Sequence, residues 1–507
     1  MSYFMGIDVG TTGSKVLLID EEGRVVGKYT VEYPLYTPKP GWSEQYPQDW
    51  WNATIKAMKI VLEKTRIDPK SVEGIGLTGQ MHGLVIIDKE FKVIRPAILW
   101  NDQRTAEEAS YINNLFGKRV IEITGSKVHT GFTAPKILWV KRHEPSNFSK
   151  IYKFMLPKDY IGFKLTGDIV TDVNDASGTS LFDVAKRKWS DEIIEALDIP
   201  YDILPEVRES PMIRGELDSS IASELGLRPH IPVVAGAGDQ GAAGVGAGAT
   251  KEGIISVNIG TSGVVFTHSD KYRFDPLGRL HSFCHAVPGK WHLMGVMLSA
   301  GGSLRWFRDN LGHLEKVVGE LIGEDPYNIL TKEAENIPIG SEGLIFLPYL
   351  AGERTPHGDP YARGVFFGIS LKHTKGHLIR AILEGVSFGL RDSLEIMLEL
   401  GIKPVEVRIL GGGSRSKLWR KIVSDIFATR VYTMHIDEGS SYGAAILASV
   451  GAKYYKSVED AVNKIVKTKD YIDPDLEAHK KYMQYYEVYR RLYKALKEEF
   501  RRLANIT

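Results

Sequence analysis

Residues 7–13 read Ile-Asp-Val-Gly-Thr-Thr-Gly, an apolar run that ends in a turn bounded by glycines, and Val16 to Ile19 form a second apolar run behind it. Half a chain later, residues 257–263 read Val-Asn-Ile-Gly-Thr-Ser-Gly and are followed by Val264 to Phe266. Apolar runs joined in this way predict a β-hairpin, in which glycine supplies the positive φ of a primed turn. Because one copy opens each half, the repeat predicts two similarly built domains.

The length of the chain supports the same division. At 507 residues it exceeds what a single hydrophobic core usually serves. We place the boundary near Gly246 to Gly253, which gives domains 1–248 and 249–507. The stretch 241–248, just before the boundary, is rich in small residues and is either a tightly packed helix or a hinge.

Strand-like and helix-like segments alternate along the chain, which is typical of the α/β class. The expected strands are Tyr3 to Val9, Gly74 to Leu77, Leu84 to Ile87 and Val405 to Leu410. The expected helices are Trp50 to Lys64, Lys417 to Phe427 and His479 to Arg502. In the last of these, Tyr485, Tyr489 and Leu492 recur at helical spacing, which predicts a surface helix with a packed aromatic stripe.

Composition excludes several functional classes. The formal net charge is +1 with basic residues spread along the chain, which argues against a nucleic-acid partner. The single cysteine, Cys284, fits a reducing compartment. No secretory signal and no apolar run near membrane-spanning length is found, so we expect a cytoplasmic protein without a membrane partner.

The first hairpin tip has the chemistry of a phosphate site. A Gly-Thr-Thr-Gly turn presents backbone N–H groups together with the hydroxyls of Thr11 and Thr12. Asp8 stands just before it among apolar neighbours, where a carboxylate needs a partner. Either a Mg²⁺ ion carried by the phosphates or a nearby backbone amide would supply that partner.

A second acidic residue follows an apolar run in the middle of the chain. Residues 236–241 read Gly-Ala-Gly-Asp-Gln-Gly and follow Ile231 to Ala235. The glycine spacing formally matches a dinucleotide-binding oxidoreductase, but Asp239 would set a negative charge near the pyrophosphate. The alternative is that Asp239, at a strand end on a glycine-rich turn, is a general base for a substrate hydroxyl, ionised at neutral pH with an ordinary pKa of about 3.9.

Three further segments combine glycine with polar or aromatic residues. Residues 79–83 (Gly-Gln-Met-His-Gly) and 100–104 (Trp-Asn-Asp-Gln-Arg) could bind a polyhydroxylated carbon chain, although Asp102 and Arg104 could equally form a local surface pair. Residues 411–416 (Gly-Gly-Gly-Ser-Arg-Ser) either let a flat adenine lie against the backbone or make a tight strand-to-helix turn.

Taken together these segments resemble the FGGY family of carbohydrate kinases over essentially the whole chain. Residues 133–139 (Thr-Ala-Pro-Lys-Ile-Leu-Trp) resemble one family signature, and residues 364–385 resemble the other. The resemblance implies two ribonuclease-H-like domains, of the ATPase fold shared by actin, hexokinase and the heat-shock chaperones, which close on ATP and a sugar. It also makes a homodimer an expectation.

Within the family, several segments resemble most closely the members that phosphorylate D-xylulose. These segments are residues 79–83, 100–102, 156–160, 282–286 and 347–357. The resemblance implies that Asp239 takes the proton of the terminal sugar hydroxyl and that Asp8 helps to hold Mg²⁺. It assigns sugar contacts to Met81, His82, Trp100, Asp102, Asp239 and Gln240. It assigns ATP contacts to Thr11, Thr12, Lys15, Gly260, Thr261, Gly301, Gly412, Gly413 and Lys417.

One position departs from that pattern. Gln240 follows Asp239, where bacterial xylulose-specific members have Asn. Gln keeps the same donor and acceptor types but reaches one methylene further. Ribulose, gluconate and glycerol therefore stay open as substrates, as does a non-metabolic ATPase of the actin or chaperone type, which would turn over ATP without stimulation by sugar.

Overall fold

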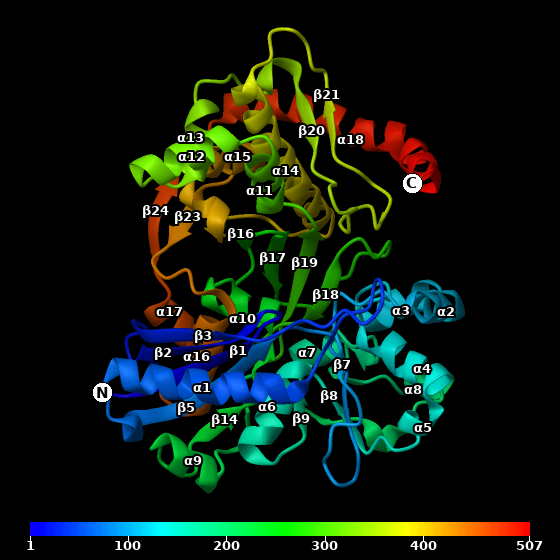
Figure 1. The fold of residues 1–507 in the computed structure, drawn as a ribbon, viewed down its shortest axis with the longest axis vertical. Coiled ribbons are helices and arrows are strands. Elements are labelled where there is room, and N and C mark those ends of the chain that lie inside the picture. Colours follow the sequence, from blue (N-terminus) through cyan, green and yellow to red (C-terminus); the bar gives the residue numbers. More distant parts are fainter. Residues whose placement is uncertain (507) are drawn as a thin grey trace. The chain divides into compact units, whose positions relative to one another are not determined.

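The computed structural model describes residues 1–506, which form two compact units (Figure 1). The first unit comprises Met1–Lys251, His268–His292 and Glu438–Val466, and the second comprises the other described residues. The units therefore do not follow the halves 1–248 and 249–507 along the chain, because two segments from the second half pack into the first unit.

The first unit is built on a seven-stranded sheet in the order β13-β14-β5-β1-β2-β3, with β15 also paired to β5. Its strands are β1 (Tyr3–Val9), β2 (Gly13–Asp20), β3 (Val25–Glu32), β5 (Val72–Gly79), β13 (Ile213–Glu216), β14 (Pro232–Val234) and β15 (Ala237–Gly238). β1 pairs antiparallel with β2 and parallel with β5. The predicted strand at Leu84 to Ile87 is β6 (Val85–Ile87), which pairs with β8 (Lys153–Met155) outside this sheet.

The two faces of this sheet are packed differently. On one face, Ile7 and Leu77 belong to an apolar core that includes Met58 of α1 (Pro47–Thr65). On the other face the strands present glycine, and α16 (Gly439–Gly451) lies directly on the backbone. A Cβ at Gly6 would come within 2.0 Å of Ser441 O, and one at Gly76 within 1.9 Å of Ala444 O. Because successive side chains of a strand point to opposite faces of the sheet, one face packs against the apolar core and the other contacts the backbone of α16.

The first unit contains a second apolar core besides the one on the sheet. Its helices are α2 (Ala106–Phe116), α3 (Lys118–Thr124), α4 (Thr133–His143), α5 (Pro145–Phe148), α6 (Pro157–Thr166), α7 (Val173–Ser177), α8 (Asp191–Ala196), α9 (Ser219–Leu225), α10 (Asp239–Gly246) and α17 (Val458–Ile465). Its short strands are β4 (Glu44–Gln45), β7 (Ala97–Ile98), β9 (Val170–Asp172), β10 (Phe182–Asp183), β11 (Lys188–Trp189), β12 (Glu206–Arg208) and β18 (His281–Cys284).

The small-residue stretch 241–248 forms most of α10, a tightly packed helix rather than a hinge. A Cβ at Gly443 of α16 would come within 1.8 Å of Ala242 O, and one at Gly246 within 2.6 Å of Gly439 O. Glycine and alanine are needed here because the two helix backbones nearly touch. α16 is thus enclosed between the sheet and α10.

The second unit repeats the plan of the first. Its strands are β16 (Ile254–Ile259), β17 (Gly263–Ser269), β19 (Trp291–Met297), β22 (Glu406–Leu410), β23 (Val431–Met434) and β24 (Thr468–Ile472), with β20 (Ile345–Leu347) and β21 (Val365–Phe367) as a separate pair. β16 pairs antiparallel with β17 and parallel with β22. This matches β1 with β2 and β5, so the repeat in the sequence is a repeat in the structure.

The helices of the second unit include the predicted C-terminal helix. They are α11 (Gly301–Asn310), α12 (His313–Ile322), α13 (Pro326–Glu333), α14 (Lys375–Glu399), α15 (Lys417–Phe427) and α18 (Leu476–Ile506). The buried stripe of α18 runs through Tyr482, Tyr486, Tyr489 and Tyr493, whereas the predicted Tyr485 is only half-buried. No helix in residues 1–506 has the length and apolarity needed to cross a membrane.

The prediction that the hairpin glycines supply a positive φ is wrong. None of Gly10, Gly13, Gly260 and Gly263 has a positive φ. Space decides instead: a Cβ at Gly13 would come within 2.8 Å of Val31 O, and one at Gly263 within 2.8 Å of Met297 Cγ. The turns are therefore not primed turns, and Gly13 and Gly263 serve close packing.

The glycine face of the first sheet should be intolerant of a single methyl group. We expect Gly76→Ala to destabilise the protein by about 1–3 kcal/mol or more, because the new Cβ meets the rigid backbone of α16. The matched control is Gly412→Ala, where a Cβ meets nothing within 4 Å. Thermal unfolding of both variants checks this; equal midpoints would contradict the packing argument.

Candidate active site

Asp8 lies near the end of β1, on the glycine face that meets α16. Its Oδ2 accepts a hydrogen bond of 2.5 Å from Ser440 Oγ in the first turn of α16. Burial raises the pKa of Asp8, and the bond from Ser440 and the charge of Lys15 oppose that rise. A cation beside this carboxylate would compensate for its burial.

Side chains from three segments fix the tip of the first hairpin. Gln45 Nε2 donates to Thr11 O at 2.7 Å, and Gln80 Nε2 donates to Gly10 O at 3.2 Å. The Thr11 hydroxyl accepts from Trp100 Nε1 at 2.9 Å and donates to Gln80 Oε1 at 3.3 Å. Thr12 is exposed at the tip. Because side chains of the first unit bind the carbonyl oxygens of Gly10 and Thr11, the turn is rigid. Its backbone N–H groups are suited to bind an anion.

Lys15, a predicted ATP contact, is paired within the first unit. Its Nζ lies 2.7 Å from Glu438 Oε2, and Lys28 pairs with the other oxygen of the same carboxylate. Glu438 immediately precedes α16, so these pairs hold the start of α16 beside β2 and β3. A direct bond from Lys15 to a phosphate stays a prediction.

Asp239 begins α10 directly after β15, where the structure confirms a strand end on a glycine-rich turn. As a residue Asp239 is half-buried. Burial and then the negative charge of Asp8 raise the pKa of Asp239 to about 7, opposed by hydrogen bonds from Gln240. The ordinary pKa expected from the sequence is therefore wrong. At neutral pH this carboxyl is poised between its two protonation states, which suits a proton acceptor.

Met81 lies against the turn that carries Asp239, and His82 lies against Gly178 at the end of α7. A Cβ at Gly238 would come within 2.6 Å of Met81 Cγ, and one at Gly178 within 2.7 Å of His82 Cε1. His82 stacks on Phe132 with ring centroids 4.2 Å apart, and its Nδ1 lies 2.7 Å from Gly178 O. Gly238 thus leaves room for Met81 beside the turn before Asp239, and contact of Met81 and His82 with a sugar stays a prediction.

His82 has a left-handed backbone, and two residues of α4 hold it. Its φ is 67°, an uncommon value for a residue other than glycine. Lys136 Nζ donates to His82 O at 2.7 Å, and Thr133 Oγ1 donates to the same oxygen at 3.1 Å. Lys136 is fully buried, and burial holds its pKa well below the ordinary value. The signature segment 133–139 was noticed in the sequence, but this positioning role was not.

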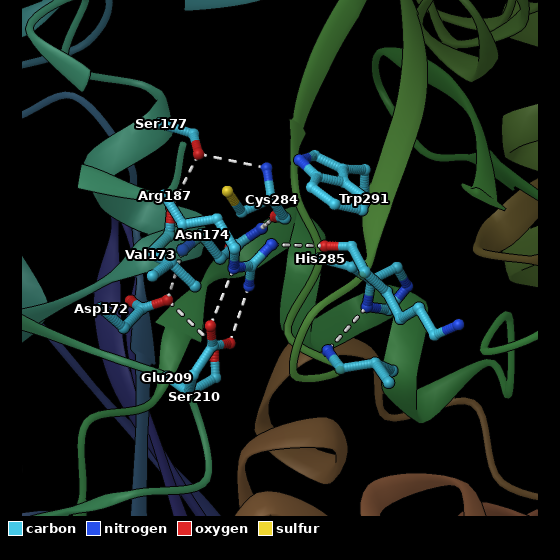
Figure 2. Close-up of polar contacts among 12 residues, drawn as sticks. Asp172, Val173, Asn174, Ser177, Arg187, Glu209, Ser210, Cys284, His285 and Trp291 are labelled. Carbon is cyan, nitrogen blue, oxygen red and sulfur yellow. Dashed lines mark hydrogen bonds and ion pairs between the residues drawn. The ribbon is translucent and has the colours of Figure 1, made fainter. Parts of the chain in front are cut away.

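Asn174 fixes the backbone just before Asp239. Its Oδ1 accepts from Gly238 N at 2.9 Å, and its Nδ2 donates to Cys284 O at 2.7 Å. Figure 2 shows Asn174 beside Cys284, whose own N–H donates to Ser177 Oγ at 3.1 Å. Burial raises the pKa of the Cys284 thiol to about 12, so it is a poor nucleophile. Cys284 therefore acts through its backbone, as part of the support for Asp239.

The same region contains a half-buried ion pair of Arg187 and a fully buried cluster around Lys158. Arg187 makes a two-pronged pair with Glu209, at 2.8 and 2.7 Å, and also donates to Lys290 O at 2.9 Å (Figure 2). Lys158 is enclosed by carboxylates, at 2.9 Å from Asp172 and 3.4 Å from Asp175. Asp172 caps α7, the helix that carries Asn174. These pairs hold α7 in place under the Asp239 turn.

Asp102 and Trp100, in the same loop, differ in burial and in the residues that they contact. The Asp102 carboxylate is fully buried and accepts from Ser43 N and from the Arg104 side chain at 2.8 and 2.9 Å. Asp102 therefore stabilises its own loop by pairing with Arg104. The sequence left such a local pair open, but at the surface, whereas the structure buries it. Trp100 is 38% exposed and donates to Thr11, so it links the loop 100–104 to the hairpin tip.

The second unit contains a cavity of about 530 Å³. Among the residues predicted to bind ATP, it is lined by Gly260, Thr261, Gly301, Gly412 and Gly413. α11 starts against the second hairpin, since Gly301 N donates to Gly260 O at 2.8 Å. The cavity is large enough for a nucleoside, and the glycines of residues 411–413 leave one wall without side chains.

Several residues of this cavity were not predicted from the sequence. Lys417 is exposed at the start of α15 and is not among the residues that line the cavity, so its contact with ATP stays a prediction. The missed lining residues are Arg305 and Arg308 on α11 and Tyr327, Asn328 and Thr331 on α13, with Asp325 before it. Arg308 lies 4.7 Å from the ring centroid of Tyr327. No motif marks these residues, because they come together only through the packing of α11 and α13.

The residues present fit a magnesium ion that the nucleotide brings with it. Within residues 1–506 no cluster of three or more His, Cys, Asp or Glu side chains could hold a metal by itself. Asp8 offers one oxygen ligand in a position where a cation would offset its burial. Mg²⁺ commonly takes one or two protein carboxylates together with phosphate oxygens and water.

Two α/β units with matching hairpins, a poised carboxyl beside a rigid phosphate turn, and a nucleoside-sized cavity together define a phosphotransferase of the actin- and hexokinase-type ATPase fold. Residues 3–246 match the N-terminal domain of the FGGY family of carbohydrate kinases, and residues 255–452 match its C-terminal domain. The chain belongs to the FGGY family of carbohydrate kinases and is a kinase.

Individual relatives match over nearly their whole length. The chain is 41% identical to the xylulose kinase of Escherichia coli, covering 97% of this chain and 99% of that protein. It is 35% identical to the gluconokinase of Bacillus subtilis, covering 99% and 98%. The crystal structure of a kinase from Brucella ovis, described as a xyloylose kinase, superposes with a TM-score of 0.89 at 36% identity, covering 98% and 99%.

The bonds from α4 to His82 should control affinity for the carbohydrate. We expect Lys136→Met to raise the KM for the carbohydrate by roughly 5- to 150-fold, the range given by losing a hydrogen bond of about 1–3 kcal/mol, and to leave the KM for ATP unchanged. A merely structural role would lower the unfolding temperature without separating the two KM values. The control is Lys188→Met, an exposed lysine of the same unit. Equal KM values in Lys136→Met and wild type would contradict the positioning role.

Proposed function

We propose that this kinase transfers the γ-phosphoryl group of ATP to O5 of D-xylulose, giving D-xylulose 5-phosphate and ADP. The observation that carries the proposal is Asp239, a carboxyl with a pKa of about 7 that directly follows Gly238, where Met81 packs, and that lies in the same unit as Asp8 and the first hairpin. The segment 79–83, and the E. coli xylulose kinase matched over nearly its full length, favour xylulose.

In the proposed reaction Asp239 accepts the proton from the O5 hydroxyl. The O5 oxygen then attacks the γ-phosphorus, while the bond from that phosphorus to the bridging oxygen breaks and ADP leaves with the electron pair. Met81 and His82 hold the sugar so that O5 lies within reach of Asp239, and Gln240 keeps the carboxylate oriented through its N–H at 2.8 Å. Positioning and charge stabilisation carry most of such a transfer.

Asp8 and the hairpin tip serve the phosphates in this proposal. A Mg²⁺ ion bound with ATP would neutralise part of the phosphate charge, and Asp8 would be its protein ligand. Thr11 and Thr12 would donate to phosphate oxygens from the first unit, and Gly260 and Thr261 from the second. The cavity lined by Gly412, Gly413 and Tyr327 would take the nucleoside.

Gluconate is a second candidate substrate. The B. subtilis gluconokinase matches 99% of this chain, and Gln240 departs from the xylulose-specific pattern by one methylene. The two sugars differ in charge, since gluconate carries a carboxylate. The remaining parts of the proposal are a cytoplasmic location and a homodimer.

A coupled ADP-release assay with MgATP tests the substrate. We expect D-xylulose to give kcat/KM at least about tenfold above D- and L-ribulose, glycerol and gluconate, a ratio worth about 1.4 kcal/mol of transition-state binding. Preference for another polyol would overturn the xylulose assignment, and an equal rate with and without every sugar would overturn sugar phosphorylation.

Two variants in the same assay test whether turnover requires the Asp239 carboxyl itself. Asp239→Ala should lower kcat by about 10²–10⁴-fold, the usual contribution of a general base. Asp218→Ala, at an exposed helix cap of the same unit, should keep wild-type kcat. Near-wild-type turnover of Asp239→Ala would remove Asp239 from the reaction.

A further inference from the structure

One arginine of the second unit has no counter-ion. Arg354 lies in the loop between β20 and β21 and is half-buried. Within residues 1–506 its guanidinium makes no hydrogen bond and no ion pair. Burial lowers the pKa of Arg354, and the charge of Glu353 opposes that change. A guanidinium that is partly removed from water without a counter-ion is unfavourable unless a ligand supplies negative charge.

The neighbouring carboxyl serves the backbone of Arg354 and not its side chain. Glu353 is buried, and its Oε1 accepts from the N–H of Arg354 at 2.7 Å and from the N–H of Leu298 at 3.1 Å. Burial raises the pKa of Glu353 well above its ordinary value, which disfavours the charge that an ion pair would need. Glu353 therefore fixes where Arg354 lies and leaves the guanidinium available.

The loop that carries Arg354 is bonded along the end of β19. Thr355 N donates to Val296 O at 3.0 Å, and Thr355 Oγ1 accepts from Val296 N at 3.1 Å. The bond from Leu298 to Glu353 continues this contact past the last residue of the strand. Figure 1 shows β19 beside β17, the second strand of the repeated hairpin. Arg354 thus has a fixed position at the end of β19.

The end of β19 leads directly to the tip of the second hairpin. Ala300 N donates to Thr261 O at 3.0 Å, and Gly301 N donates to Gly260 O at 2.8 Å. Gly260, Thr261 and Gly301 also line the cavity of the second unit. The short segment between β19 and α11 therefore connects Arg354 with the turn that is proposed to bind phosphate.

We propose that Arg354 binds the γ-phosphoryl group of the nucleotide and stabilises its charge during transfer. A guanidinium presents a planar fork of donors that matches phosphate oxygens. Arg354 keeps its own proton throughout, and the proton of the acceptor hydroxyl goes to Asp239. This inference rests on the proposed transfer from ATP, but not on which sugar is phosphorylated.

Steady-state kinetics of Arg354→Met test the contact. We expect kcat to fall roughly 10- to 150-fold, the range for losing hydrogen bonds to a charged group. Arg354→Lys should recover part of that loss, because lysine keeps the charge without the fork. The matched control is Arg502→Met, an exposed arginine of the same unit, which should keep wild-type kcat. Near-wild-type kcat in Arg354→Met would overturn the proposal.

Nucleotide binding in the absence of sugar separates this contact from a structural role. Calorimetry with Mg²⁺ compares ADP with adenosine 5′-(β,γ-imido)triphosphate. We expect Arg354→Met to weaken binding of the triphosphate at least about fivefold and to leave ADP binding unchanged, because ADP has no γ-phosphate. Equal weakening of both nucleotides would show that Arg354 supports the fold and would contradict the contact.

The same variant distinguishes a phosphate from a carboxylate on the substrate. Loss of turnover confined to gluconate, with D-xylulose turnover intact, would assign Arg354 to the sugar carboxylate and overturn the proposal. Failure of the proposed function has a different signature, because it appears in the wild type as ADP release that no sugar stimulates. The binding comparison needs no sugar, so a wrong sugar assignment leaves its result decisive for Arg354.

Discussion

The close approach of α16 to the first sheet is the contact on which the candidate site depends. It requires Gly6 and Gly76 on the strands and Gly443 on the helix, where a side chain would collide with backbone. Because the helix lies this close, its first turn reaches Asp8 through Ser440, and its other side holds α10, which begins with Asp239. Packing of glycine backbones thus positions two carboxyls that are 231 residues apart in sequence.

The electrostatics of the site follow from this packing. Two carboxyls in the same buried region cannot both ionise easily, and the charge of Asp8 contributes to the raised pKa of Asp239. Binding of a cation with the phosphates would reverse that effect by neutralising Asp8. A lower pKa would leave more of the Asp239 carboxyl ionised at neutral pH, and therefore ready to accept a proton, once the nucleotide and its cation are bound.

Much of the fold and part of the candidate site could be predicted from the sequence. The repeated hairpin, the α/β class, the helix Lys417–Phe427 and the carboxyl Asp239 at a strand end needed only local patterns. The predictions that were wrong depend on tertiary contacts. Gly13 and Gly263 avoid neighbouring atoms rather than provide a positive φ, and the pKa of Asp239 depends on burial and on Asp8. Segments 268–292 and 438–466 joined the first unit for the same reason, since local patterns do not reveal which sheet a later segment will pack against.

The pH dependence of kcat/KM for D-xylulose tests the central claim most directly, because this parameter reports the ionisation of the free enzyme. If Asp239 accepts the proton and has a pKa of about 7, log kcat/KM should be level above that pH and fall by about one unit for each pH unit below it. Asp8→Asn should move the fall to lower pH, whatever its effect on the plateau, because the negative charge that raises the pKa is gone. A profile that stays level down to about pH 5, near the ordinary range of a carboxyl, would contradict the account.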